Sequence, residues 1–290
     1  MKLLSVLEAT TTHFTKHALP SPRLQAELLI AHALSLPRLS LYLQFERELT
    51  APELEILRPL VRRRAAREPI QHITGTTSFS GLTLRCSPAA LIPRPETELL
   101  IELANQMLQN QPPSLVIDVG TGTGAIPLAL ARRQPQHRYL GIDISPEALL
   151  LAKENSTHPL SAPPEGTEVD WKENDLLQNL AEPALLLTAN LPYLTPAEID
   201  SAEPEVRHDP TLALDGGKDG LDLFRRLLPQ AALIAPALLL ECSPHQTAPL
   251  ALLAQQSGYS QTAIHPDLTS RPRFVEARRD GRPCLLSHFA

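Results

Sequence analysis

Four consecutive residues, Asn190, Leu191, Pro192 and Tyr193, combine an amide, a stiffened backbone and an aromatic ring directly after an apolar stretch. The Asn190 side-chain oxygen can accept a hydrogen bond. Leu191 precedes a proline, which favours an extended backbone and can direct the Leu191 carbonyl outward as a second acceptor. Two acceptors and a ring suit a planar group with two N–H bonds, such as a primary amide or an exocyclic amine. The simpler alternative is a strand-end turn with a buried tyrosine.

A glycine-rich loop lies within "LVIDVGTGTGAIPLALA", which reads as an apolar strand, a turn and a helix. Gly120, Gly122 and Gly124 permit positive φ angles and a close approach of the backbone to a ligand. The helix that follows directs free N–H groups at whatever lies there. The spacing also fits a looser dinucleotide fingerprint through Gly120, Gly122 and Ala125, so the loop alone leaves the cofactor open.

Carboxylates follow the next two candidate strands. Asp143 ends "YLGID" and can accept hydrogen bonds from both hydroxyls of a ribose. It could instead cap the following helix, although Ser145 is the better capping candidate. Asp175 and Leu176 end "WKENDLL", where they would either border and cover an adenine ring or form an ordinary loop.

A ribose with an adenine suits NAD and S-adenosylmethionine alike. An NAD enzyme also needs a hydride acceptor site, yet His137, His158 and His208 form no evident acid–base pair. The Asn190 group favours S-adenosylmethionine. An amide nitrogen is a poor nucleophile, and two acceptors on its hydrogens stabilise the positive charge that grows as it attacks a sulfonium methyl. A binding protein that only senses nucleotides would leave these four residues unexplained.

The elements that must position these residues fall into three regions. Residues 1–68 show apolar residues at helical spacing, with Ser21 and Thr50 as capping candidates, and predict a small helical, substrate-positioning domain. Residues 69–90 alternate and predict a linking β-hairpin. Residues 91–290 alternate between strands and helices and predict an α/β, doubly wound, mostly parallel sheet. The candidate strands are "SLVIDVG", "HRYLGIDI", "EVDWKEN", "ALLLTAN" and "ALLLECS".

Composition limits the function classes. The formal net charge of −6 disfavours a protein whose main work is gripping nucleic acid. Cys86, Cys242 and Cys284 have neither a disulfide nor a metal spacing, which predicts no metal site and fits a reducing cytoplasm. The N-terminus becomes polar too early for a signal peptide, and the longest apolar run, Ala231 to Leu240, is too short to span a bilayer.

Several motifs together resemble a known family. "DVGTGTGAI", "GIDIS" and "NLPY", in this order, are similar to class I S-adenosylmethionine-dependent methyltransferases that modify amino or amide nitrogen. The stretches "PIQHITGTTSFSGLTLRCSPAALIPRPETELLIE", "EPEVRHDPTLALDGGKDGLDLFRRLL" and "DLTSRPRFVEARR" resemble the HemK/PrmC family of peptide chain release factor glutamine methyltransferases. The likeness runs from about residue 60 to 280, and the helical N-terminus matches in character and length.

The resemblance implies a function and a set of site residues. The family methylates the glutamine of the Gly-Gly-Gln tripeptide in release factors. Asn190 through Tyr193 would form the glutamine pocket, with Asn190, Pro192 and Tyr193 as the catalytic group. The cofactor would be held by the loop, the strand-end residues and the amide, namely Gly120, Thr121, Gly122, Thr123, Gly124, Asp143, Asp175, Leu176 and Asn190. One departure is plain, since the family's usual residue at the second position of the tetrapeptide is proline and here it is Leu191.

Two further stretches have more than one interpretation. In "IPRPETE", Pro95 and Glu96 suit a helix first turn, whereas Arg94 is less easily explained by capping and is placed near the cofactor. The run "VRRRAARE" is either a solvated helix end or a contact for ribosomal RNA or a release factor.

The rival enzyme class is an amino-methyltransferase acting on an exocyclic amine of DNA or RNA, which needs base flipping and a basic, aromatic-rich face. The acidic chain argues against it. We therefore expect release factors as partners, no membrane association, no stable nucleic-acid binding, a monomer and a cytoplasmic location.

Overall fold

The structure is a computed structural model that describes residues 1–285. The chain divides into two compact units. The first comprises Met1–Gly75 together with the short segment Glu203–His208, and the second comprises Thr76–Ala202 together with the described residues from Asp209 onward. The first unit therefore continues past residue 68, where the sequence pattern placed the end of the helical domain.

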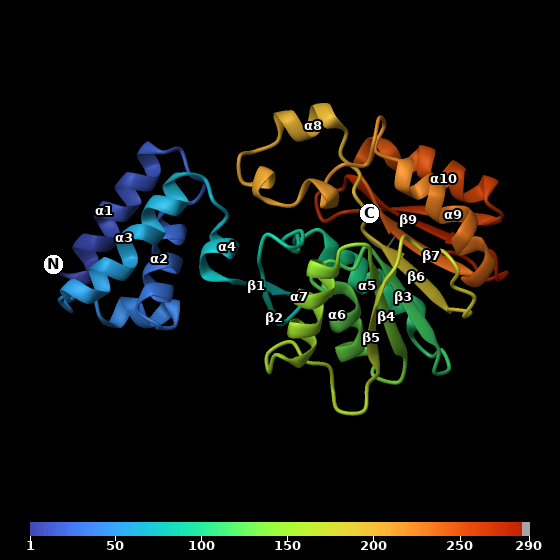
Figure 1. The fold of residues 1–290 in the computed structure, drawn as a ribbon, viewed down its shortest axis with the longest axis horizontal. Coiled ribbons are helices and arrows are strands. Elements are labelled where there is room, and N and C mark those ends of the chain that lie inside the picture. Colours follow the sequence, from blue (N-terminus) through green and yellow to red (C-terminus); the bar gives the residue numbers. More distant parts are fainter. Residues whose placement is uncertain (286–290) are drawn as a thin grey trace. The chain divides into compact units, whose positions relative to one another are not determined.

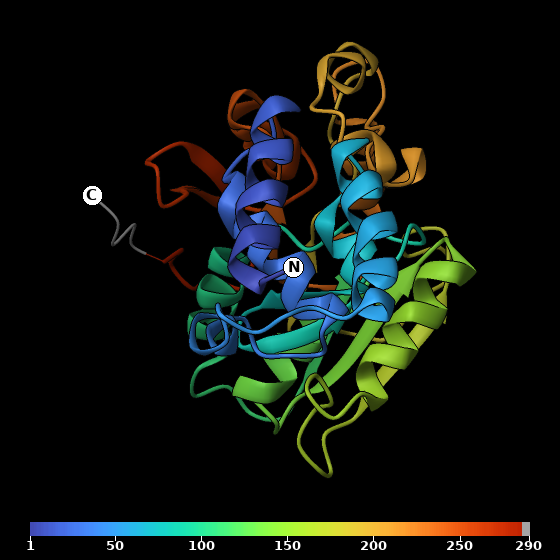
Figure 2. The same ribbon diagram turned by 90° about the vertical axis from the view of Figure 1, so that its left-hand side faces the viewer.

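The first unit is helical, and its helices are the blue and cyan coils of Figure 2. Thr50 is the N-cap of α3 and forms a capping box. Its hydroxyl accepts a hydrogen bond from the Glu53 backbone N–H, and its own backbone N–H donates to the Glu53 carboxylate. Ser21 precedes α2 but makes no side-chain capping bond, so that sequence expectation was wrong. The elements are α1 (Leu3–Lys16), α2 (Pro22–Ala33), the 3-10 helix η1 (Arg38–Leu43), α3 (Ala51–Ala65) and α4 (Ile70–Thr74).

The basic run at the end of α3 has a structural role within this unit. Arg64 is buried, and its Nη2 lies 2.6 Å from Oε1 of Glu205. Arg67 holds the other oxygen of Glu205 at 2.6 Å. Arg63 pairs with Glu68. Two arginines on one carboxylate thus bind the segment Glu203–His208 to the helical unit, and only part of the run is a solvated helix end.

The second unit contains a seven-stranded sheet in the order β5-β4-β3-β6-β7-β9-β8. The first five of these strands pair in parallel, and β9 runs antiparallel to both of its neighbours. All five candidate strands of the sequence are present as β3 to β7, whereas β8 and β9 were not predicted. The bounds are β3 (Leu115–Val119), β4 (Arg138–Asp143), β5 (Val169–Glu173), β6 (Leu186–Ala189), β7 (Ala237–Glu241), β8 (Gln261–Pro266) and β9 (Pro272–Arg278).

Helices cover both faces of this sheet, as Figure 1 shows. Leu115, Ile117 and Val119 of β3 pack in one core with α9 and α10, whereas Val116 packs in the other core with α5 and α6. Such alternation buries a parallel strand on both faces and fixes its register. The helices are α5 (Thr97–Leu108), α6 (Ala125–Arg133), α7 (Pro146–Thr157), α8 (Pro196–Ser201), α9 (Asp222–Ile234) and α10 (Thr247–Gln256), with short 3-10 turns η2 (Val206–His208), η3 (Thr211–Ala213) and η4 (Pro244–Gln246).

The region 69–90 is only partly a hairpin. Its beginning forms α4, and the hairpin itself consists of β1 (Thr76–Phe79) and β2 (Leu82–Arg85). Phe79, Leu82 and Leu84 are buried in the same core as α5 and α6, so the hairpin belongs to the second unit. Within the described residues, no helix is both long and apolar enough to cross a membrane.

Candidate active site

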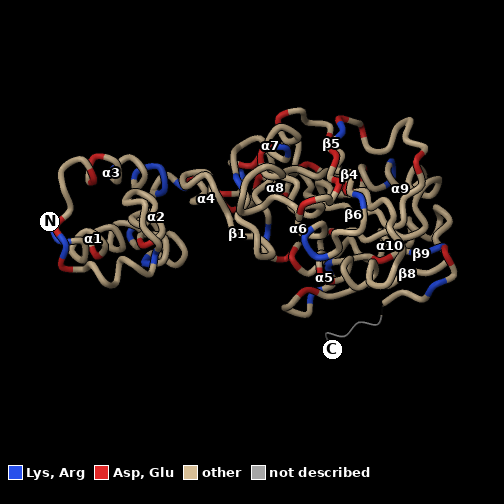
Figure 3. The backbone as a smooth tube through the Cα atoms, turned by 90° about the horizontal axis from the view of Figure 1, so that it is seen from below, with Lys and Arg blue, Asp and Glu red and all other residues tan. Residues whose placement is uncertain are grey.

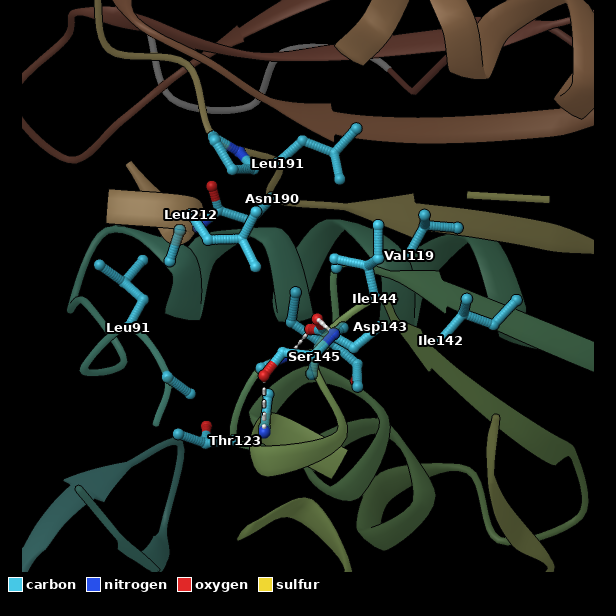
Figure 4. A pocket seen from close by; sticks show the side chains of 18 of the residues that line it. Leu91, Val119, Thr123, Ile142, Asp143, Ile144, Ser145, Asn190, Leu191 and Leu212 are labelled. Carbon is cyan, nitrogen blue, oxygen red and sulfur yellow. Dashed lines mark hydrogen bonds between the residues drawn. The ribbon is translucent and has the colours of Figure 1, made fainter. Parts of the chain in front are cut away.

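A cavity of about 250 Å³ opens at the carboxyl ends of β3, β4 and β6, where parallel sheets commonly bind ligands. Figure 4 shows this pocket with residues from the glycine loop, the end of β4 and the segment after β6 converging on it. Most of the residues singled out in the sequence line it, namely Gly120, Thr121, Gly122, Thr123, Asp143, Asp175, Leu176, Asn190, Leu191 and Pro192. Gly124 and Tyr193 are not among the lining residues.

The glycine loop takes its shape from positive φ angles and from bonds to β4. Gly120, Gly122 and Gly124 have φ of +72°, +54° and +78°, a region that side chains with a Cβ rarely adopt. The N–H groups of Gly120 and Thr121 both donate to the carbonyl of Ile142, at 2.8 and 2.9 Å. Gly124 directly precedes α6, and a Cβ there would stand 2.6 Å from the ring of Trp171. Gly124 therefore shapes the loop from behind, while Gly120 and Gly122 face the pocket.

Asp143 links the loop to the end of β4. Its Oδ2 accepts the N–H of Gly122 at 2.8 Å, and its Oδ1 accepts the N–H of Ser145 at 3.0 Å. Burial raises the pKa of Asp143, and these backbone bonds oppose that rise. Ser145 caps α7, as the sequence predicted, by accepting the N–H of Ala148 at 3.1 Å. The carboxylate is thus held rigidly at the pocket wall with lone pairs left for a hydroxylated ligand.

Asp175 and Leu176 border the pocket after β5. Asp175 pairs with Arg226 of α9 at 2.5 Å, and Arg226 also lines the pocket. Leu176 is buried and has a φ of +53°, which is uncommon for a residue with a branched side chain. Strained backbone of this kind concentrates at ligand sites. The apolar Leu176 surface can cover a flat ring.

Asn190 and Leu191 close the other side of the pocket. Asn190 Nδ2 donates to Oγ1 of Thr97, the first residue of α5, at 3.1 Å. Its Oδ1 is buried and has no partner among the described residues. The Leu191 side chain is buried and packs over Gly120. An acceptor without a partner beside a glycine loop is where a donor on a ligand would bind.

Tyr193 is not among the residues that line the cavity, and its contacts are with other elements. Its hydroxyl accepts a hydrogen bond from Nη2 of Arg273 at 2.7 Å, and the guanidinium lies 5.3 Å from the ring centroid. Its backbone carbonyl accepts from Gln246 at 2.7 Å. Burial raises the pKa of Tyr193 to about 12, so the phenol stays protonated. The partly buried ring packs against the core that also contains Leu191.

The side chains of the stretch "IPRPETE" make three kinds of contact. Arg94 lines the pocket and pairs with the buried Asp209 at 2.5 Å. Thr97 holds Asn190. Glu98 accepts the N–H of Ser80 in the hairpin turn at 3.0 Å. Glu96 occupies the N-cap position of α5 without a side-chain capping bond, so capping explains little of the motif.

Several polar residues at or beside the site were not identified from the sequence pattern. Asp118 lies buried under the glycine loop and accepts the Thr188 hydroxyl at 2.8 Å, and burial raises its pKa to about 7. Glu241 ends β7 beside β6, and Arg273 lies on β9. Glu241 could have been found by the same strand-end rule that identified Asn190. Arg273 could not, because the antiparallel insertion of β9 gives no such signal.

Comparison with known proteins gives full-length relatives, of which two are described here. The release factor glutamine methyltransferase of Deinococcus radiodurans is 43% identical over 97% of this chain and 100% of its own length. The protein of the same name from Streptomyces coelicolor is 35% identical over 96% of this chain and 98% of its own length. The chain belongs to the release factor glutamine methyltransferase family.

Family models agree with this membership, and a solved structure shares the fold. Residues 5–75 match the PrmC N-terminal domain, and residues 116–207 match a methyltransferase domain. The crystal structure of the hMettl16 catalytic domain in complex with a 3'UTR hairpin superposes with a TM-score of 0.56, at 16% identity over 71% of this chain and 78% of that one. That likeness shows the fold alone. The second unit is a class I methyltransferase domain, and the family uses S-adenosylmethionine.

Proposed function

We propose that this protein methylates the side-chain amide nitrogen of the glutamine in the Gly-Gly-Gln motif of peptide chain release factors, with S-adenosylmethionine as methyl donor. The observation that carries the proposal is the buried Oδ1 of Asn190 at the wall of the pocket, for which residues 1–285 supply no hydrogen-bond partner. An acceptor held there suits an N–H of a primary amide, and the relatives from Deinococcus radiodurans and Streptomyces coelicolor bear the name of this activity.

The described residues fit the cofactor. Gly120 and Gly122 leave backbone without side chains at the cavity, and Asp143 offers a carboxylate to the ribose hydroxyls. Thr121 also lines the cavity, and we place the methionine part of the cofactor against this loop. Thr123, Asp175 and Leu176 complete this side. S-adenosylmethionine supplies a methyl group that is electrophilic because it is attached to a positively charged sulfur.

The protein's own contribution is to bind and orient the amide. Asn190 Oδ1 and the Leu191 carbonyl would each accept one N–H of the glutamine, which favours positive charge on the nitrogen as it reacts. Pro192 holds the carbonyl of Leu191 in place through its restricted backbone. Tyr193 supports this wall from behind through Arg273. No strong base is required, because the methylated nitrogen becomes acidic and can lose its proton to water.

The helical unit is assigned to positioning the release factor. The chain leaves the methyltransferase unit after Ala202, adds Glu203–His208 to the helical unit and returns at Asp209. The residues that follow, Pro210, Leu212 and Ala213, line the pocket. The chain that carries Glu203–His208 therefore continues directly into residues that line the cavity.

The alternative substrate, an exocyclic amine of a nucleic acid, is less favoured. Figure 3 shows Lys and Arg interspersed with Asp and Glu along the described backbone. The formal net charge is −6, and phosphate binding needs a surplus of positive charge. A cytoplasmic monomer that meets release factors and makes no stable complex with nucleic acid is the state we propose.

The test compares methyl transfer from labelled S-adenosylmethionine to purified release factor and to DNA and RNA oligonucleotides. The rate of methyl transfer to the release factor should fall by about a hundredfold in Asn190→Ala, which is the size expected when one preorganised polar group is removed. Asn105→Ala is the matched control, since Asn105 is also a half-buried amide, bonds Gln134 and lies outside the pocket. Equal activity of both variants, or transfer to oligonucleotides alone, would contradict the proposal.

A further inference from the structure

Behind Asn190, a series of buried and half-buried polar side chains comes from four elements of the methyltransferase unit. Asn190 follows β6, Thr97 begins α5, Glu241 ends β7 and Arg273 lies on β9. Asn190 Nδ2 donates to Thr97 Oγ1 at 3.1 Å. Arg273 Nη2 lies 3.3 Å from Glu241 Oε1, and the Glu241 carboxyl is fully buried. Burial raises the pKa of the Glu241 carboxyl, and Arg273 and the Thr97 hydroxyl oppose that rise.

The orientation of the Asn190 amide decides what the pocket can bind. With Nδ2 toward Thr97, the oxygen faces the cavity and can accept an N–H. With the amide turned over, the cavity would face a donor, which repels the N–H bonds of a glutamine amide. A threonine hydroxyl alone does not choose between the two, since it can either donate or accept.

The rest of the series removes this ambiguity. Arg273 is only a donor, and its guanidinium keeps Glu241 on the accepting side of their contact. Burial raises the pKa of Glu241, while Arg273 and Thr97 lower it. Glu241 Oε2 has no hydrogen-bond partner among the described residues, so this carboxylate oxygen can accept a hydrogen bond from the Thr97 hydroxyl. Thr97 then has only its lone pairs for Asn190, which must offer Nδ2.

We infer that Thr97, Glu241 and Arg273 are positioning residues that hold the acceptor side of Asn190 toward the substrate amide. The inference rests on the proposed function, because it explains how that function's acceptor is oriented. In this series the Arg273 cation faces Glu241, Glu241 accepts from Thr97, and Thr97 accepts from Asn190. Arg273 also donates to the Tyr193 hydroxyl, so one cation fixes both ends of the Asn190–Tyr193 segment.

The experiment replaces the hydroxyl of Thr97 by a methyl group of similar shape. Thr97→Val removes the donor and acceptor, whereas Thr97→Ser keeps them and is the matched control. Single-turnover methylation of release factor should fall roughly ten- to a hundredfold in Thr97→Val, the size seen when an outer hydrogen-bond partner of a site is removed. Thr97→Ser should stay within a few-fold of the unchanged protein, and binding of S-adenosylhomocysteine by calorimetry should match in both variants.

A double-mutant cycle with Asn190→Ala separates positioning from a general structural effect. If Thr97 acts through Asn190, Thr97→Val should have little further effect on the rate once Asn190 is alanine. The inference would be overturned if the rate losses of Thr97→Val and Asn190→Ala multiplied in the double variant, or if Thr97→Val and Thr97→Ser had equal rates. Should Thr97→Val fail to fold, the same cycle is run with Glu241→Gln, which gives Thr97 an ambivalent amide partner. Failure of the proposed function looks different, because the unchanged protein would then transfer no methyl to release factor.

Discussion

The Leu191 side chain stands where a β-carbon on Gly120 would have to go. Its Cδ2 atom is 2.9 Å from that position, closer than real β-carbons approach other atoms. Gly120 comes from the loop after β3, and Leu191 comes from the segment after β6. The cofactor loop and the amide-binding segment therefore touch directly, and each limits the other's residue choice.

Gly120→Ala should disturb both halves of the site. The new methyl group meets Leu191, and the φ of +72° is unfavourable for alanine. Gly166→Ala is the matched control, since its φ is +84° but nothing lies within 4 Å of the new methyl group. Calorimetry with S-adenosylhomocysteine should show weakened binding in Gly120→Ala and unchanged binding in Gly166→Ala. Equal losses in both would mean that strain, and not the contact with Leu191, limits the position.

Asp143→Ala should weaken cofactor binding by roughly 1–3 kcal/mol, the cost of losing a charged hydrogen bond. The carboxylate also bonds Gly122 and Ser145, so the glycine loop should become more mobile as well. Asp170→Ala, an exposed aspartate on β5, serves as the control. Titration calorimetry of both variants measures the difference, and an unchanged dissociation constant in Asp143→Ala would exclude Asp143 from the ribose site.

Asp118 should make stability depend on pH in an unusual direction. Burial raises its pKa from 3.8 to about 7, so between these values the folded protein holds a proton that the unfolded chain releases. The stabilisation is full below the unfolded pKa and is lost as pH rises to about 7. The stability of Asp118→Asn relative to the unchanged protein should therefore rise over this range. Urea unfolding at several pH values measures it, and a constant difference would refute the assignment.

Glu205→Ala should loosen the segment Glu203–His208 from the helical unit. It leaves the buried Arg64 and its neighbour Arg67 without their shared carboxylate. Hydrogen exchange should become faster in this segment, and methylation of intact release factor should slow while cofactor binding stays unchanged. Glu203→Ala, an exposed neighbour in the same segment, should change neither. Slow exchange retained in Glu205→Ala would show that other contacts bind the segment.

Strand-end reasoning from the sequence located much of the pocket. An apolar strand followed by Gly120, Asp143 or Asn190 can be recognised locally, and parallel strands bring their carboxyl ends together. The roles of these residues in binding the cofactor and the substrate amide stay predictions. What the local pattern could not give is the orientation of Tyr193, since its partner Arg273 comes from a strand far along the chain.

The unpredicted features share this origin in distant contacts. Residues 70–74 become a helix although the stretch alternates, and Ile73 packs in the helical core. Thr97 gains its role only because α5 brings it to the end of β6. Glu205 joins the helical unit because its carboxylate forms ion pairs with Arg64 of α3 and with Arg67, which follows α3. Local propensity cannot show any of these, because each depends on which elements become neighbours.

The most direct test of the account is peptide mapping by mass spectrometry of a release factor incubated with this protein and S-adenosylmethionine. We predict one added methyl group on the glutamine of the Gly-Gly-Gln motif, located by fragmentation to the side-chain amide. A release factor with that glutamine replaced by alanine should gain no methyl group. A methyl group at another residue, or none while the protein binds the cofactor, would contradict the account.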